Sequence, residues 1–203
     1  MLVFNCVCYD KPLANFCFNP SAAKTKKKGK LSSDDVKQID TLKHKFCTSA
    51  WKLVSYSFFV GYGIYALYDQ QDWLWEPVKY PICYANNQMP HLLHLYYIMA
   101  MSYYGYSSFS IFFEPKMKDR NEMLLHHGVT LSLLVSSFIG NVTKYGLAIL
   151  ILHDNADPLM EIAKLCFYNK LKILSNIFFV IFASTFIYTR VYIFPRYIIM
   201  PIA

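Results

Sequence analysis

Charged residues are scarce in this sequence, since Asp, Glu, Lys and Arg make up only 16% of its 203 residues. A soluble domain usually carries about 25% charged residues, so the low fraction argues against a soluble globular protein. In their place the sequence has 55% hydrophobic and 18% aromatic residues. This composition favours a protein that lies in a membrane.

The sequence also lacks the cysteine spacing of a disulfide framework or a structural zinc site. Its cysteines form no CxxC pair and have no metal-ligand spacing with histidine. A stapled secreted scaffold or a zinc ribbon would need such spacing. We therefore interpret the six cysteines as reduced thiols or core fillers: Cys6, Cys8, Cys17, Cys47, Cys83 and Cys166.

The formal net charge of +7 raises the question of nucleic-acid binding. The basic residues fall in short clusters between apolar runs, which is typical of membrane topology signals, so we expect no nucleic-acid partner. The first 20 residues have no basic start, and Asn5 and Asp10 interrupt their apolar character. They predict neither a signal peptide nor a spanning helix.

Several apolar runs are long enough to cross a bilayer, and they predict an all-α membrane protein with about five transmembrane helices. We interpret residues 1–45 as a polar, basic, partly disordered cytoplasmic arm and residues 46–203 as the transmembrane domain. Lys and Arg are more numerous in the connections on the side of the arm, which predicts a cytoplasmic amino terminus and a lumenal carboxy terminus. The runs cover residues 51–68, 91–113, 123–141, 145–168 and 173–194.

The third run begins with a pair of histidines, His126 and His127, followed by Thr130. Ionisable side chains are costly inside a bilayer and are therefore usually functional. Successive side chains on a helix lie about 100° apart, so Thr130 projects between the two histidines. The second run adds His91 and His94 as weaker candidates. It also has five tyrosines, which we interpret as packing and interfacial residues with one hydroxyl able to reach a cavity: Tyr96, Tyr97, Tyr103, Tyr104 and Tyr106.

The fourth run repeats this arrangement with His153, Asp154 and Asp157. Asp157 projects between the other two, and Glu161 and Lys164 continue the same stripe. Two helices that each carry a polar stripe predict an active site within the membrane. Pro158 is expected to kink the fourth helix beside the carboxylates.

Two other interpretations compete with an active site. The polar residues can form a network that only holds helices together. A zinc site is also conceivable, because imidazole and carboxylate are normal zinc ligands. Adjacent histidines point about 100° apart and chelate one ion poorly, so we expect no metal. That site would use His126, His127, His153 and Asp157.

The polar stripes resemble the Lag motif of ceramide synthases, which are TLC-domain membrane proteins. The similarity extends from Lys45 to Pro195 and thus covers most of the chain. The motif is carried by His126-His127-x-Val-Thr130, Asn141-x-x-Lys144-x-Gly146 and His153-Asp154-x-x-Asp157-x-x-x-Glu161-x-Ala-Lys164.

This resemblance implies an acyl-CoA-dependent N-acyltransferase of the endoplasmic reticulum membrane that makes ceramide or dihydroceramide. Its partners would be a fatty acyl-CoA, a long-chain sphingoid base, membrane lipid and, in oligomers, other ceramide synthase chains. Acyl-CoA is a co-substrate, so no cofactor is expected. The five helices would form most of a six-helix TLC-type barrel around an intramembrane cavity. The chain is expected to be truncated at both ends relative to the family and to have little activity alone.

The expected chemistry is the acylation of an amine. A neutral histidine can take the proton of the sphingoid ammonium, and a carboxylate can hold the histidine tautomer or the ammonium. Alternatively, a histidine attacks the thioester and forms an acyl-imidazole. The catalytic candidates are His126, His127, His153, Asp154 and Asp157, and Lys164 is a candidate contact for the CoA phosphates.

Two residues depart from the family pattern. Lys144 stands where arginine is common, and Ala100 stands where many members carry an acidic residue. Lysine keeps the charge but loses the bidentate fork. A non-enzymatic TLC-domain protein that binds or senses membrane lipid, or an inactive truncated isoform, is the alternative interpretation.

Overall fold

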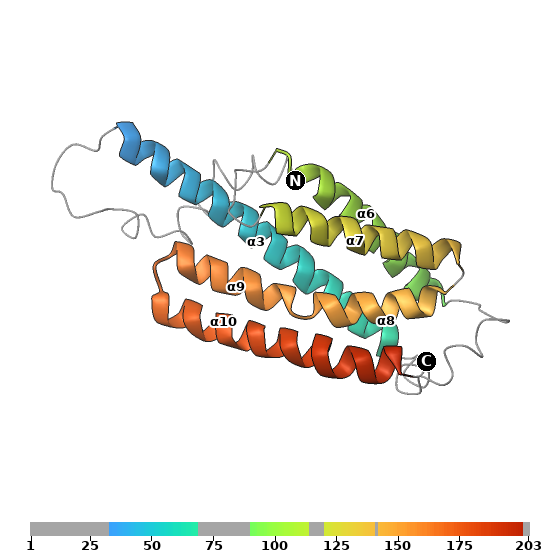
Figure 1. Cartoon of the computed structure of the whole chain (residues 1–203). Coiled ribbons are helices and arrows are strands. Elements are labelled where there is room, and N and C mark those ends of the chain that lie inside the picture. Colours follow the sequence, from blue (N-terminus) through green and yellow to red (C-terminus); the bar gives the residue numbers. More distant parts are fainter. Residues whose placement is uncertain (1–32, 69–89, 114–119, 141, 201–203) are drawn as a thin grey trace. The chain divides into compact units, whose positions relative to one another are not determined.

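The computed structural model describes residues 33–68, 90–113, 120–140 and 142–200 (Figure 1). Within these ranges every regular element is a helix, which confirms the predicted all-α class there. The predicted cytoplasmic arm covers residues 1–45; its residues 33–45 form the start of a helix, and its residues 1–32 and the motif residue Asn141 lie outside the described residues. The helices are α3 (Ser33–Tyr68), α6 (His91–Ser110), α7 (Arg120–Ile139), α8 (Thr143–Asp154), α9 (Asp157–Tyr168), α10 (Lys172–Ile187), and the π-helical η2 (Tyr188–Ile193) and η3 (Pro195–Ile199).

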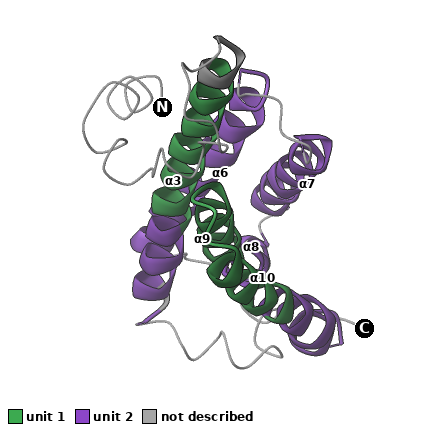
Figure 2. Ribbon diagram, turned by 90° about the vertical axis from the view of Figure 1, so that its left-hand side faces the viewer, with its two compact units in different colours: residues 1–56, 156–184 green, residues 57–155, 185–203 purple. Residues whose placement is uncertain are grey.

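The chain divides into two compact units, coloured separately in Figure 2. The first contains residues 1–56 and 156–184, and the second contains residues 57–155 and 185–203. Each unit therefore joins segments that are far apart in the sequence.

In the first unit, α9 begins at Asp157 and has Pro158 in its first turn. Proline fits there because the first amides of a helix have no partner within the helix. The sequence predicted one kinked helix over residues 145–168, whereas the structure has two helices that end and begin on either side of Asn155 and Ala156. The Ser175 hydroxyl of α10 donates a hydrogen bond of 3.0 Å to the Ala163 carbonyl of α9.

The second unit has an aromatic core that α6 provides. Tyr96, Tyr97 and Tyr104 are fully buried, and α6 packs on α7, which packs on α8. The Tyr97 hydroxyl donates a hydrogen bond of 2.6 Å to the Leu134 carbonyl of α7 and is also bonded to the Ser137 hydroxyl. Ala100, which replaces an expected acidic residue, is buried in this core. An acidic residue would need a polar partner there.

The helices α7 and α8 approach each other closely at Gly146. A Cβ atom at this position would lie 2.9 Å from the Ser137 Cβ and 2.9 Å from the Tyr97 hydroxyl. The absence of a side chain lets the two helices meet, so Gly146 is required by packing.

We predict that Gly146→Ala destabilises the protein by about 1–3 kcal/mol, because the added methyl group overpacks a closed contact. Gly105→Ala is the matched control, since a Cβ at Gly105 meets nothing within 4 Å. That control should be neutral or stabilising by about 0.5–1 kcal/mol, because alanine favours a helix interior. Thermal unfolding in detergent measures both, and equal midpoints would contradict the packing role of Gly146.

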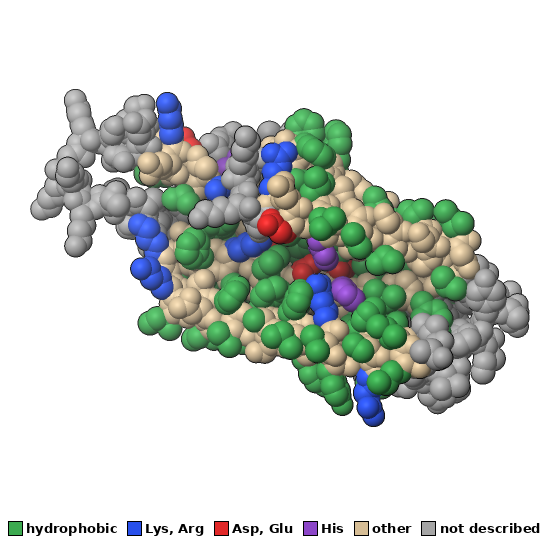
Figure 3. Space-filling model, viewed as in Figure 1, with side chains coloured by type: hydrophobic (Ala, Val, Ile, Leu, Met, Phe, Trp, Pro, Cys, Tyr) green, Lys and Arg blue, Asp and Glu red, His purple; other side chains and the backbone are tan. Residues whose placement is uncertain are grey.

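Among the described residues, two helical segments are long and apolar enough to cross a membrane, Arg120–Ile139 and Lys172–Ile199. Large hydrophobic side chains are exposed along both, and they dominate the visible surface of α10 in Figure 3. Together they support a membrane protein. The other predicted runs, in α3, α6, α8 and α9, are not among these segments, and α8 and α9 have only 12 residues each.

Two of the six cysteines lie in the described part of the chain. Cys47 and Cys166 are both buried, and neither forms a disulfide in the described part of the chain. This agrees with their interpretation as reduced core residues.

Candidate functional site

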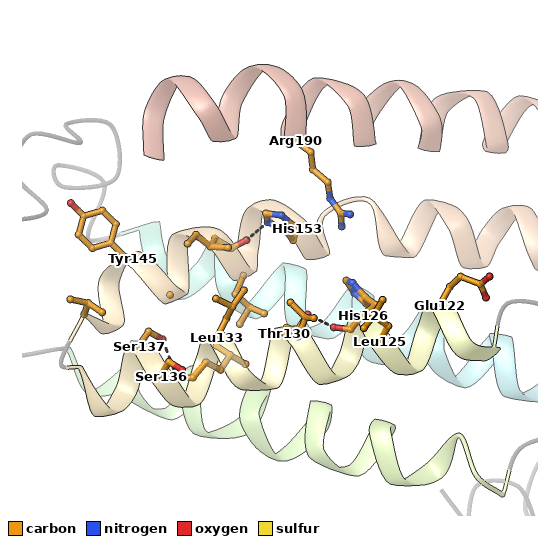
Figure 4. Close-up of a pocket in the computed structure, with 16 residues that line it drawn as sticks. Glu122, Leu125, His126, Thr130, Leu133, Ser136, Ser137, Tyr145, His153 and Arg190 are labelled. Carbon is orange, nitrogen blue, oxygen red and sulfur yellow. Dashed lines mark hydrogen bonds between the residues drawn. The ribbon is translucent and has the colours of Figure 1, made fainter. Parts of the chain in front are cut away.

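A cavity of about 640 Å³ lies in the second unit, between α7, α8 and η2 (Figure 4). His126, His153 and Arg190 each come from a different helix and lie close together in the view, and Glu122 lies beyond His126 at one end. The other end lies near Ser137 and Tyr145. The wall between the two ends is mostly apolar: Val129, Leu133 and Leu134 from α7, and Ile149 and Leu150 from α8.

Helical periodicity explains how α7 and α8 supply this lining. On α7 the lining residues include His126, Thr130, Leu133 and Ser137, whose spacings of three or four place them on one face. His153 lies four residues after Ile149 on α8 and shares its face. The sequence therefore contained the signal for both faces.

His153 has a defined tautomer. Its Nδ1 atom is 2.8 Å from the Ile149 carbonyl oxygen. Because a carbonyl oxygen can only accept, Nδ1 must carry the proton, and the lone pair of the neutral ring is then on Nε2. The ring is further held by the edge of Phe194, with centroids 5.4 Å apart. His153 is thus an oriented imidazole with one basic nitrogen.

One ring nitrogen of His126 is unsatisfied in hydrogen bonding. Its Nε2 atom is buried and has no hydrogen-bond partner among the residues that the structure describes. Buried polar groups are normally satisfied, so an unsatisfied one in a cavity suggests a role toward a ligand. Thr130, which the sequence places between the histidines, donates its hydroxyl to the His126 carbonyl at 2.9 Å instead.

Arg190 reaches from η2 into the cavity toward His126 and His153 (Figure 4). Its guanidinium carbon lies 3.9 Å from the centroid of the Phe186 ring, a cation–π contact that holds the side chain. Arg190 is not among the residues predicted for the site, because it lies near the end of the fifth apolar run, where a basic residue is typical of a membrane topology signal. Arg190 also lies on a π-helical turn, and the period of about 3.6 residues of an α-helix does not apply there.

His127 and Asp154 form a second cluster beside Tyr104. The Tyr104 hydroxyl donates a hydrogen bond to the Asp154 carboxylate, and its ring centroid is 5.5 Å from that of His127. All three residues are buried. Sequence reasoning indicated that one tyrosine hydroxyl reaches the site but could not identify Tyr104. Its signal was its spacing of seven and four residues from Tyr97 and Ala100, which share its buried face.

The two adjacent histidines therefore lie in different environments. His126 lines the cavity, and His127 does not line it but packs against Tyr104. Their ring centroids are 5.5 Å apart, as expected for side chains that leave a helix about 100° apart.

The remaining predicted residues belong to the first unit. Asp157 opens α9 and is buried, as is Glu161 one turn later. The Lys164 ammonium is 3.1 Å from a Glu161 carboxylate oxygen, so it is already in an ion pair. In the part of the chain that the structure describes, no group of three or more His, Cys, Asp or Glu could hold a metal ion, so the zinc alternative gains no support.

The sequence matches the TLC domain over residues 45–203. The chain belongs to the TLC-domain family. The match covers the cavity, the three histidines of the site and Tyr104, so all of the geometry above lies within the TLC domain.

Among the relatives of this TLC-domain chain are named ceramide synthases, which confirms the resemblance seen in the sequence. Ceramide synthase 4 of Bos taurus is 36% identical over 158 residues, which are 78% of this chain and 40% of that protein. Ceramide synthase 5 of Mus musculus is 36% identical over 155 residues, 76% of this chain and 37% of that protein. ASC1-like protein 3 of Oryza sativa subsp. japonica is 33% identical over 190 residues, 93% of this chain and 64% of that protein. The TLC-domain chain thus spans well under half the length of these two ceramide synthases.

Proposed function

We propose that this chain is the acyl-transferring part of a ceramide synthase. A fatty acyl-CoA would donate its acyl group to the amine of a long-chain sphingoid base, giving ceramide or dihydroceramide. The observation that carries the proposal is the cavity in which His126, His153 and Arg190 converge at the end of an apolar wall. Such a cavity suits an amphiphilic substrate whose reactive atoms lie at its polar end. The similarity to named ceramide synthases supports the same reaction class.

One route is direct attack by the amine. His126 or His153 accepts a proton from the amine while the amine nitrogen attacks the thioester carbonyl carbon. A C–N bond forms, the C–S bond breaks, and the proton passes from the imidazole to the departing CoA thiolate. The proton on Nδ1 of His153 leaves its Nε2 able to act as this base.

The other route passes through an acyl-imidazole. A histidine Nε2 attacks the thioester carbonyl carbon, the C–S bond breaks, and the CoA thiolate takes the ring's Nδ1 proton. The amine then attacks the acyl carbon, the C–N bond to the imidazole breaks, and the amine's proton returns to the ring. His126 suits this role because its buried Nε2 has no partner among the described residues. Neither route needs a cofactor, since acyl-CoA is consumed as a co-substrate.

The carboxylates and Lys164 have supporting roles in this proposal. Asp154, held by Tyr104, would set the charge around His127. Asp157 would hold the incoming ammonium, a pairing that favours its charged form. Lys164 would contact a CoA phosphate as a point charge after leaving its ion pair with Glu161.

We also propose the membrane in which the chain lies and its topology in that membrane. Five helices would cross the endoplasmic reticulum membrane as most of a six-helix barrel, with residues 1–45 as a cytoplasmic arm and 46–203 as the transmembrane domain. Homo-oligomers or mixed oligomers with other ceramide synthase chains would be the assembled form. Five crossings place the two ends of the chain on opposite sides. Tags at the two ends should therefore differ in protease protection on sealed microsomes, and equal access would contradict five crossings.

The function is tested by expressing residues 1–203 in cells whose own ceramide synthases have been deleted. Membranes receive a fatty acyl-CoA and sphinganine, and the N-acylated product is measured by mass spectrometry. We expect only a small amount of dihydroceramide above the level of vector-only membranes, in keeping with the little activity expected of this chain alone. Specific lipid binding without product, in protein shown to be folded, would instead favour a lipid-binding TLC-domain protein.

A further inference from the structure

We infer that Glu122 binds the ammonium group of the substrate amine at one end of the cavity. Glu122 would make the cavity select a long-chain molecule with a positively charged head group over one with a neutral head group. Because the bound amine is the one that the proposed function requires, the assignment rests on that function. Glu122 would bind and orient the amine and would not itself accept a proton from it.

Glu122 belongs to the same face of α7 as the candidate base. It lies in the first turn of α7 and lines the cavity together with His126 and Thr130, which follow it at intervals of four residues. Side chains four residues apart on a helix have Cβ atoms roughly 5–6 Å apart. Figure 4 shows both Glu122 and His126 on the side of α7 on which Arg190 lies. An ammonium bound to the Glu122 carboxylate would therefore lie about one helical turn from the His126 imidazole.

The carboxylate of Glu122 is available to a ligand. Glu122 is exposed, and its side chain forms no hydrogen bond or ion pair with another residue in the described part of the chain. It is the single acidic residue among the described residues that line the cavity. Asp157, the other proposed contact for the ammonium, lies in the other compact unit and is not among those lining residues. The first contact of an amine that enters the cavity would therefore be with Glu122.

The positive charge of Arg190 gives the cavity a reason to carry a carboxylate. Arg190 lines the same cavity, and its guanidinium stays charged at every physiological pH. It would attract the carbonyl oxygen of an acyl donor but repel an ammonium, and opposed like charges disfavour binding. Glu122 would offset that repulsion. The two charges would thus direct the two substrates, with the acyl carbonyl toward Arg190 and the amine toward Glu122.

A carboxylate in the first turn of a helix can also have a purely structural role. It interacts favourably with the partial positive charge at the helix N-terminus, and such an interaction stabilises the helix whether or not a ligand is bound. Loss of that interaction would lower the stability of the protein, but it would not distinguish a charged ligand from a neutral one. A pair of ligands that differ only in charge can therefore separate the two roles.

The first test is a comparison of KM values. Glu122→Gln removes the charge and keeps the shape of the side chain, and it should raise KM for sphinganine by about 3- to 10-fold, a moderate effect because the contact is partly exposed to solvent. KM for the acyl-CoA should stay within about twofold of wild type. Glu122→Asp keeps the charge and should recover most of the affinity for the amine. Asp40→Asn is the matched control, since it removes a carboxylate at an exposed position of α3 outside this cavity, and it should match wild type.

A second measurement does not depend on catalysis. N,N-Dimethylsphinganine is positively charged at neutral pH, and it cannot form the amide product because its neutral nitrogen has no hydrogen to lose. Its binding to the full chain in nonionic detergent is compared with that of an analogue that has hydrogen in place of the amino group. Wild type should bind the charged ligand more tightly. Glu122→Gln should weaken binding of the charged ligand by about 3- to 10-fold and leave binding of the neutral analogue unchanged.

The outcomes separate the ammonium contact from the proposed function. Charge-selective binding that depends on Glu122, without acyl transfer, would support the contact and count against the enzyme. Acyl transfer with the same KM for sphinganine in wild type and Glu122→Gln would overturn the contact and leave the enzyme standing. Equal affinity of wild type for the charged and neutral ligands, or an equal change in both affinities in Glu122→Gln, would leave Glu122 with a structural role and would also overturn the contact.

Discussion

His126→Ala is expected to lower the rate of acyl transfer by about 10²–10⁴-fold, the usual contribution of a positioned acid–base or nucleophilic group. The variant removes the imidazole whose Nε2 is buried in the cavity without a partner among the described residues. The rate is measured with acyl-CoA and sphinganine in membranes that contain equal amounts of wild-type and variant protein. Because the side chain is only partly buried, we expect the fold to persist.

His94→Ala is the matched control for this variant. It is the same substitution in the same compact unit, but His94 is exposed on α6, with its ring centroid 6.3 Å from that of Phe138. Its activity should stay within about twofold of wild type, since exposed positions away from a site are usually tolerant. If both variants lose activity equally, the loss reflects helix packing and His126 is not catalytic.

Tyr104→Phe is expected to reduce turnover by about 10- to 100-fold, equivalent to the roughly 1–3 kcal/mol cost of leaving a buried group without its hydrogen bond. The variant keeps the ring against His127 and removes only the hydroxyl that donates to Asp154. The Asp154 carboxylate would then lack this hydrogen-bond donor, and its movement toward another donor would change the position of His127. Turnover, KM and the pH dependence of the rate are measured together.

A positioning role predicts a particular pattern in those measurements. Turnover should fall and its pH dependence should shift, while KM changes little, because Tyr104 is not among the residues that line the cavity. Tyr106→Phe on the exposed side of α6 is the control and should match wild type. A Tyr104→Phe enzyme with an unchanged pH profile and a lowered unfolding temperature would show that Tyr104 serves packing alone.

Much of the candidate site follows from helical periodicity, as α7 and α8 illustrate. The spacing of His126 and Thr130 predicted a polar stripe on α7, and both residues line the cavity. Periodicity gives the angle between His126 and His127 but not which of them faces a neighbour. That choice depends on Tyr104 of α6, which lies more than 20 positions earlier in the chain.

Two features were beyond the reach of the sequence pattern for identifiable reasons. Arg190 lies on a π-helical turn, so a period of 3.6 residues misjudges the direction of its side chain. The break between α8 and α9 replaced an expected kink because Pro158 is tolerated in a first helical turn more readily than within a helix. In both cases the local backbone conformation determines where the side chains lie, and the pattern of apolar residues does not predict that conformation.

The connection of α7 to α8 by a short turn has a consequence for the order of folding. Both long walls of the cavity belong to one helical hairpin, so most of their contacts are between residues close in sequence and carry a small loop-closure cost. We expect this hairpin to form early, while the chain is still being synthesised. Arg190 comes from a segment made later. During synthesis the protein would thus form the apolar groove between α7 and α8 first. The Arg190 guanidinium, which makes one part of the groove suitable for a polar head group, would be added afterwards.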